Sequence, residues 1–179
     1  MNRAASAAIL TFLATAFLAA CANQPAYAPA APMVEVQPGA SVFSARDFAW
    51  SVAPGGGSIV GALTYEAGGQ RFDCAGRDVI LTPETPWSRL RMVILYGSPT
   101  RADVPLEIVR ARTPSAPSGD YARYVRKTTC DTGNRFSFAG LPDGAWFVIT
   151  LARPESGGDP VAIMRRVETN GGVRQLTLN

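Results

Sequence analysis

The chain of 179 residues contains no histidine. This absence excludes Ser-His-Asp and Cys-His catalytic machinery, and it excludes zinc or copper sites that depend on histidine ligands. Lysine is nearly as scarce, because Lys127 is the only one among 17 basic residues. Lys127 has no S-x-x-K spacing around it, so a Ser-Lys dyad is not expected. Neither a G-x-x-x-x-G-K-[ST] loop nor a G-x-G-x-x-G turn that leads into a helix is present.

Charged residues are also sparse and nearly balanced. The 17 Lys and Arg residues stand against 14 Asp and Glu residues, which gives a formal net charge of +3. No long basic run occurs, and this balance is not typical of nucleic-acid binding. Acids with the D-x-D-x-D spacing of a calcium loop are missing as well. The sequence therefore predicts no nucleic-acid partner, no metal and no cofactor.

The first apolar run is short and ends at a cysteine. Arg3 precedes residues 7–20, which are too few to span a bilayer but have the length of a signal-peptide core. Leu18-Ala19-Ala20-Cys21 resembles a bacterial lipobox, in which the signal is cut before a cysteine that becomes acylated. Two or three acyl chains would anchor the protein firmly, because each buried methylene contributes roughly 0.8 kcal/mol. The alternative is an ordinary secretory signal in which Cys21 is incidental.

The lipobox predicts a lipid-anchored protein on the periplasmic side of the cell envelope. Ala22 follows the cysteine where an Asp would resemble an inner-membrane retention signal, so we expect the outer membrane. Residues 22–44 are rich in Pro and Ala, and this composition favours an extended chain without a core. We therefore expect a signal peptide at 1–20, a lipidated cysteine with its tether at 21–45, and one folded domain at 46–179.

Two further cysteines, Cys74 and Cys130, lie in the predicted folded domain. In an oxidising compartment, two thiols in one small domain usually form a disulfide. Closing a loop of this length stabilises a fold by about 4 kcal/mol in the chain-entropy model. The alternative is a redox-active pair, but the sequence has no C-x-x-C motif to support it. We predict a structural disulfide between Cys74 and Cys130.

The folded domain has the pattern of a mainly β structure. Apolar and β-branched runs alternate with turns of Gly, Pro and Asn at short intervals. Strands are predicted at residues 59–67, 78–82, 106–111, 121–129, 135–138, 145–151, 161–167 and 173–178. The charges within residues 121–129 predict an edge strand, and the apolar residues 145–151 predict a strand in the core of a sandwich. Asn170-Gly171-Gly172 has the residues of a hairpin turn.

Residues 86–96 break this pattern. Thr85 can cap a helix, Pro86 suits its first position, and Gly97 suits its end. The run Val93-Ile94-Leu95-Tyr96 has high β-propensity, so a strand is the competing interpretation. We predict a short helix.

A family resemblance rests on two motifs. Residues 131–138, Asp-Thr-Gly-Asn-Arg-Phe-Ser-Phe, are followed by residues 140–146, Gly-Leu-Pro-Asp-Gly-Ala-Trp. Together they resemble the T-D-x-x-G-x-F-x-F and L-P-x-G-x-Y pattern of carboxypeptidase regulatory-like domains. Residues 59–64 and 79–83 resemble the first two strands of such a domain. The resemblance covers about half of the folded region and implies a single transthyretin-like antiparallel β-sandwich of about seven strands.

The sequence departs from the family pattern at three positions. Asn134 stands where the family usually has Gly, and Asn is the next-best residue for a left-handed turn. Trp146 replaces the usual Tyr and keeps a large aromatic side chain in the core. Cys130 takes the Thr position, which fits a disulfide from this turn to the loop at Cys74. The family motif defines a fold and no active site, so the resemblance implies a spacer or binding module.

Our first hypothesis is a non-catalytic lipoprotein that presents a β-sandwich for envelope binding or a structural role. Its partners would be the lipid bilayer and an envelope protein, peptide or glycan. Arginines beside aromatic residues can engage such partners. The candidate binding patch comprises Trp87, Arg89, Arg91, Tyr121, Arg123, Tyr124 and Arg126. The alternative for each pair is a solvated charged face over core aromatics.

The second hypothesis is an enzyme that uses paired carboxylates, such as a glycan hydrolase or an accessory module of an envelope enzyme. Carboxylate pairs are the one catalytic device that the missing residues leave open. The acids in question are Glu66, Asp73, Asp78 and Glu84, which fall in one region of the sequence. Two of them at about 5–10 Å in a cleft would favour this hypothesis. Without such a pair we expect no catalytic residue.

Overall fold

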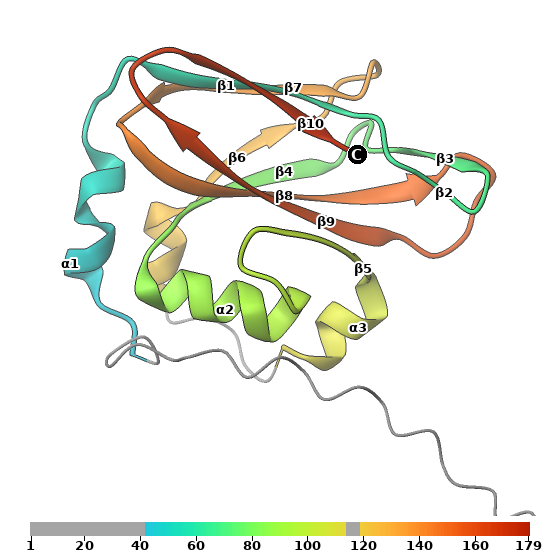
Figure 1. Cartoon of the computed structure of the whole chain (residues 1–179), viewed down its shortest axis with the longest axis horizontal. Coiled ribbons are helices and arrows are strands. Elements are labelled where there is room, and N and C mark those ends of the chain that lie inside the picture. Colours follow the sequence, from blue (N-terminus) through green and yellow to red (C-terminus); the bar gives the residue numbers. More distant parts are fainter. Residues whose placement is uncertain (1–41, 114–118) are drawn as a thin grey trace, which may run out of the picture. The chain divides into compact units, whose positions relative to one another are not determined.

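The structure is a computed structural model, and it describes residues 42–113 and 119–179 (Figure 1). The signal peptide, the acylated Cys21 and nearly all of the tether, as predicted from the sequence, lie outside the described residues. Within the described part, every helix is too short or too polar to pass through a bilayer.

Two β-sheets form the framework. The smaller sheet has the order β10-β1-β7, with β1 (Gly57–Leu63), β7 (Arg135–Leu141) and β10 (Val173–Leu178). The larger sheet follows the order β2-β3-β8-β4-β6, and β9 and β5 extend it from β8. Its strands are β2 (Glu66–Ala67), β3 (Gln70–Asp73), β4 (Asp78–Pro83), β5 (Arg101–Pro105), β6 (Arg126–Thr129), β8 (Gly144–Pro154) and β9 (Val161–Thr169). The predicted β-sandwich is confirmed, and β6 is the edge strand expected within residues 121–129.

The main core lies between the two sheets. Strand β1 alternates buried and less buried positions, as expected for a strand with one face in the core. Ile59 from β1 meets Trp146 and Val148 from β8, and all three side chains are fully buried. Gly61 gives room to the Phe136 ring, because a Cβ there would come within 2.1 Å of the Phe136 Cζ. Apolar burial between the sheets therefore stabilises the sandwich.

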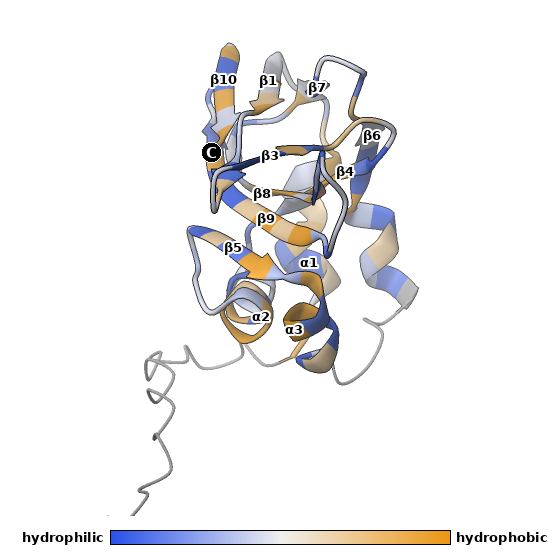
Figure 2. Cartoon of the chain, turned by 90° about the vertical axis from the view of Figure 1, so that its right-hand side faces the viewer, coloured by the Kyte–Doolittle hydropathy of each residue, from blue (hydrophilic) through white to orange (hydrophobic). Residues whose placement is uncertain are grey.

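Helices α2 (Pro86–Tyr96) and α3 (Leu106–Ala111) cover the other face of the larger sheet, which makes a third layer (Figure 2). Met92 and Leu95 of α2 and Val109 of α3 pack against Phe147 and Met164 of the sheet. Strand β8 is consequently buried on both faces, which explains its nearly continuous apolar sequence.

The predicted helix at 86–96 is confirmed, and the competing strand is wrong. Thr85 accepts a hydrogen bond from the Ser88 amide at 3.1 Å, and the Ser88 hydroxyl accepts one from the Thr85 amide at 2.8 Å. This reciprocal pair is a capping box. Gly97 ends the helix at φ +74°, a conformation that glycine adopts without strain.

Three of the predicted strands are wrong in whole or in part. Residues 59–67 are divided between β1, which ends at Leu63, and β2, which belongs to the other sheet. Residues 106–111 form α3, because a helix here places Val109 on the sheet, where it packs with Phe147 and Met164. Only residues 126–129 of the segment 121–129 form a strand. Its first part belongs to the 3₁₀ helix η2 (Gly119–Tyr124), whose tyrosines turn inward to a buried cluster.

The turn at Asn170-Gly171-Gly172 was predicted as a hairpin, and this too is wrong. Strand β10 does not pair with β9; it pairs in parallel with β1 of the opposite sheet. The glycines allow a tight change of direction, with Gly171 at φ +75°, and that turn carries the chain from one sheet to the other.

The predicted disulfide is present. Cys74 and Cys130 are bonded with a Cα–Cα distance of 5.7 Å, and both are buried. Asn134 adopts φ +61°, as expected for the left-handed turn, and its Oδ1 accepts a hydrogen bond from the Cys74 amide at 2.8 Å. The turn before β7 is thus fixed to the loop after β3 by the disulfide, by this hydrogen bond and by backbone hydrogen bonds of Cys130 with Gly76 and Arg77.

The described chain begins with α1 (Ala45–Phe48) and the 3₁₀ helix η1 (Ala49–Val52), which pack on the sandwich. Trp50 lies against Trp146 with 4.9 Å between ring centroids. It also covers Gly144, where a Cβ would come within 2.3 Å of the indole ring. The segment that follows the predicted tether is therefore an integral part of the fold.

Candidate functional site

The structure brings the two halves of the predicted binding patch together. Trp87, Arg89 and Arg91 lie on α2, whereas Tyr121, Arg123 and Tyr124 lie on η2 and Arg126 lies on β6. The rings of Trp87 and Tyr121 are 4.9 Å apart between centroids. Residues more than 30 positions apart in the sequence therefore form one neighbourhood.

The aromatic rings of this neighbourhood face the interior. Tyr121 is 9 % exposed and Tyr124 is 7 % exposed, and both pack against the fully buried Phe48 of α1. The Tyr121 hydroxyl also shares a hydrogen bond of 2.6 Å with the Thr82 hydroxyl. We call these rings the aromatic cluster, which consists of Phe43, Phe48, Trp87, Tyr121 and Tyr124. The faces of these rings pack against one another, so the cluster joins α1, α2 and η2.

The arginines of the patch are also engaged within the protein. Arg91 lies over the Trp87 ring at 5.6 Å, and Arg123 lies over the Tyr124 ring at 5.4 Å. Arg89 donates to the Glu84 carboxylate at 2.5 Å. Arg126 donates to the carbonyl oxygen of Ser51 at 3.0 Å. These contacts match a charged face over core aromatics, and ligand binding by this patch stays a prediction.

Three of the four acids proposed for carboxylate catalysis are paired with basic side chains. Glu66 bonds Arg71 at 3.1 Å, and Asp78 lies 3.6 Å from Lys127. Glu84 accepts from both Arg89 and Arg166 at 2.5 Å. These contacts give the paired-carboxylate hypothesis no support, because protein cations occupy the oxygens. Among the described residues, no group of three or more His, Cys, Asp or Glu side chains could hold a metal.

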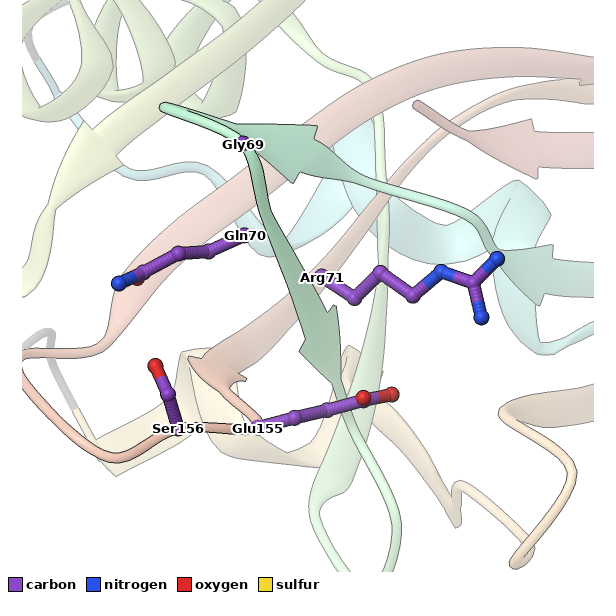
Figure 3. Close-up of a pocket in the computed structure, with 5 residues that line it drawn as sticks. All are labelled: Gly69, Gln70, Arg71, Glu155 and Ser156. Carbon is purple, nitrogen blue, oxygen red and sulfur yellow. The ribbon is translucent and has the colours of Figure 1, made fainter.

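An open pocket of about 430 Å³ lies at another part of the molecule, between two turns (Figure 3). Its lining comes from the β2–β3 turn and the turn after β8, with Gly69, Gln70, Arg71, Glu155 and Ser156. We call it the turn pocket. Its size lies within the range of about 300–1,000 Å³ that is common for small-ligand sites.

Glycine shapes both turns beside this space. Gly68 and Gly69 adopt φ +59° and +73°, and Gly157 adopts φ +85°. Positive φ values favour glycine at these positions, so each turn has its shape from these residues.

Backbone pairing holds the two turns in register. Strand β3 pairs with β8 through Phe72 opposite Pro154 and Asp73 opposite Arg153. The Glu155 amide then donates to the Arg71 carbonyl at 2.9 Å, which continues the pairing to the pocket. The polar side chains of the turn pocket thus project from a hydrogen-bonded frame.

The side chains divide into two pairs. Figure 3 shows Gln70 and Ser156 on one side of β3, and Arg71 and Glu155 on the other. Arg71 uses its Nε to bond Glu66, which leaves its terminal nitrogens facing solvent. Within residues 42–113 and 119–179, the side chains of Gln70, Glu155 and Ser156 make no hydrogen bond or ion pair. An amide, a hydroxyl, a carboxylate and a guanidinium are therefore available to a ligand.

Reasoning from the sequence missed the turn pocket. Gly68-Gly69 and Ser156-Gly157-Gly158 are both common turn sequences, and turns of this kind punctuate the whole folded domain. The one usable signal was that both turns carry paired glycines beside polar residues. Nothing in the sequence indicates that the two turns are neighbours, because that contact depends on the pairing of β3 with β8.

No protein-family model matches this chain, and neither does any curated protein. A solved structure from Pseudomonas aeruginosa, of a proposed carbohydrate-binding protein, is similar in fold with a TM-score of 0.57. The two chains are 21 % identical, and the similarity covers 76 % of this chain and 96 % of that one. This similarity identifies the fold, a mainly β sandwich that also occurs in the Pseudomonas protein.

Proposed function

We propose that this chain is a non-catalytic carbohydrate-binding β-sandwich that is held in the cell envelope by acyl chains on Cys21. The observation that carries the proposal is the turn pocket, whose lining includes four exposed polar side chains of different chemistry, two on each side of β3. Sugar hydroxyls both donate and accept hydrogen bonds, so an amide, a hydroxyl, a carboxylate and a guanidinium suit them. The similar fold of a proposed carbohydrate-binding protein supports the same function.

The arrangement of the domain fits an anchored binding module. The described chain begins beside α1, at one end of the sandwich, and the turn pocket lies at the other end (Figure 1). The described chain therefore enters the domain at the end opposite the pocket. The resemblance to carboxypeptidase regulatory-like domains, which are spacers or binding modules, agrees with this proposal.

Binding to saccharides is the direct test. The full chain in detergent is applied to an array of bacterial envelope saccharides, and each hit is measured by calorimetry. We expect saturable binding of at least one saccharide without any change to its covalent structure. Release of cleaved sugar would contradict a non-catalytic role, and a complete lack of binding would contradict the proposed function.

The anchor has its own test. Cells that express the protein are labelled with palmitate, and membranes are separated by density. We expect the label to appear in the outer-membrane fraction and to disappear in Cys21→Ser. The double variant Cys74→Ala with Cys130→Ala is the control, because it removes the other two cysteines and should keep the label. Label that persists in Cys21→Ser would refute the lipid anchor.

A further inference from the structure

The turn pocket is lined by one arginine and one acid, Arg71 and Glu155, and Arg71 also bonds Glu66. Two strand pairings bring charged residues to one face of the sheet, namely Glu66 opposite Arg71 and Asp73 opposite Arg153. Glu155 continues the first of these rows, because its amide bonds the Arg71 carbonyl. Glu66 and Glu155 therefore flank Arg71 in one row, so this row has two acids and one arginine, whereas the whole chain has a formal net charge of +3.

The arginine that lines the pocket, Arg71, is paired with an acid on its own hairpin. Arg71 bonds Glu66 at 3.1 Å through Nε, and Glu155 lies on the same side of β3 as Arg71 (Figure 3). One guanidinium is thus placed between two carboxylates. A ligand carboxylate or sulfate that approached Arg71 would meet this local excess of negative charge, and like charges at short range disfavour binding.

The other side of the pocket is uncharged. Gln70 and Ser156 lie together there, and both side chains are exposed. An amide oxygen accepts, an amide nitrogen donates, and a hydroxyl does both, so this pair can bond a neutral hydroxyl or acetamido group. A sugar hydroxyl or acetamido group can therefore make its hydrogen bonds here without a charged partner.

From these observations we infer that the turn pocket recognises a saccharide unit without an acidic group and discriminates against acidic glycans. Gln70 and Ser156 supply the hydrogen bonds to the neutral sugar, and Glu155 supplies the discrimination by charge. This inference rests on the proposed function, since it names the ligand class of the same site.

The experiment compares three soluble oligosaccharides of equal length: one of glucose, one of N-acetylglucosamine and one of galacturonate. The full chain in detergent is titrated with each by calorimetry at low salt. We expect at least one of the two neutral oligosaccharides to bind at least tenfold more tightly than the acidic one. Gln70→Ala should weaken the binding of the neutral ligand about tenfold. Gln175→Ala, which changes an exposed glutamine on β10, should leave that binding unchanged.

Charge discrimination has a separate variant. Glu155→Gln should reduce the ratio between the affinities for the neutral and acidic ligands at least threefold. The effect of this substitution should become smaller as salt is added. The matched control, Glu107→Gln on α3, should leave the difference unchanged. Equal or tighter binding of the acidic oligosaccharide, or equal effects of Gln70→Ala and Gln175→Ala, would overturn this inference and leave the proposed function standing. Absence of binding to any saccharide on the array would instead overturn the proposed function itself.

Discussion

The aromatic cluster and the turn pocket lie in different parts of the fold, and their side chains differ in what they contact. In the aromatic cluster, each ring packs on others at centroid distances between 4.9 and 6.5 Å. Arg91 and Arg123 cover its rings from the surface. In the turn pocket, polar side chains extend from glycine turns and three of them have no described protein partner. Arginine occurs in both places, so its presence alone does not identify a binding site.

The difference separates the region that stabilises the fold from the region that we propose for recognition. Buried aromatic rings contribute through area removed from water and through edge-to-face contacts. Exposed polar side chains contribute little to folding, because water satisfies them in both the folded and unfolded states. We therefore expect substitutions in the aromatic cluster to change stability, and substitutions in the turn pocket to change binding.

The largest expected effect is that of Phe48→Ala. Phe48 is fully buried and contacts Phe43, Trp87, Tyr121 and Tyr124. Its removal leaves a cavity at the junction of three helices, so we expect the free energy of unfolding to fall by about 3–5 kcal/mol. Urea denaturation followed by tryptophan fluorescence measures this change. Val52→Ala in the same segment is the control, because Val52 is 60 % exposed and its loss should be nearly neutral.

If Phe48→Ala only detaches α1 as a unit and leaves the sandwich intact, the free energy of unfolding of the sandwich should fall by less. The denaturation curve would then show two transitions, and the cluster would be a local contact. A cost below about 1 kcal/mol would contradict the role of the cluster in joining the helices to the fold.

Alkaline pH should weaken the region beside the aromatic cluster. Burial raises the pKa of Tyr96 to about 12, and burial raises the pKa of Tyr121 as well. An unfolded tyrosine loses its proton near pH 10, whereas folded Tyr96 keeps its proton until about pH 12. The contribution of Tyr96 to the free energy of unfolding is therefore fully present below pH 10 and is lost as the pH rises toward 12. This loss amounts to on the order of 2 kcal/mol.

The variant Tyr96→Phe isolates this effect, because phenylalanine cannot ionise. We expect the unfolding free energy of the native chain to fall between pH 10 and pH 11.5, and that of Tyr96→Phe to fall less steeply. Urea denaturation at a series of pH values gives both slopes. Identical slopes would show that Tyr96 ionises alike in the folded and unfolded states.

Local signals in the sequence predicted the local parts of this fold. Thr85, Pro86 and Gly97 predicted the helix α2, and Asn134 predicted a left-handed turn, because capping and positive φ depend on a few adjacent residues. The Cys74–Cys130 disulfide followed from the count of cysteines in one domain. The strands followed from apolar runs and turn residues, and the sandwich followed from the resemblance to carboxypeptidase regulatory-like domains.

Features that depend on long-range pairing could not be predicted in this way. Residues 106–111 have β-branched residues in a strand-like run, but the space above the larger sheet selects a helix with Val109 inward. Strand β10 pairs with β1 and not with its neighbour in sequence, so the preceding turn could not reveal its partner. The turn pocket exists only because β3 pairs with β8. Prediction from one sequence therefore located the elements better than the site.

The smallest expected effect is on stability in the turn pocket, and it completes the comparison. Gln70 and Ser156 are exposed and make no hydrogen bond within the described residues. Gln70→Ala and Ser156→Ala should therefore change the free energy of unfolding by less than about 0.5 kcal/mol, in contrast to Phe48→Ala. The same urea denaturation measures all three variants. If either pocket variant costs more than about 1 kcal/mol, its side chain supports the fold, and a loss of saccharide binding in that variant would no longer locate the ligand. A stable variant that fails to bind separates recognition from folding, and only that combination assigns the turn pocket to the ligand.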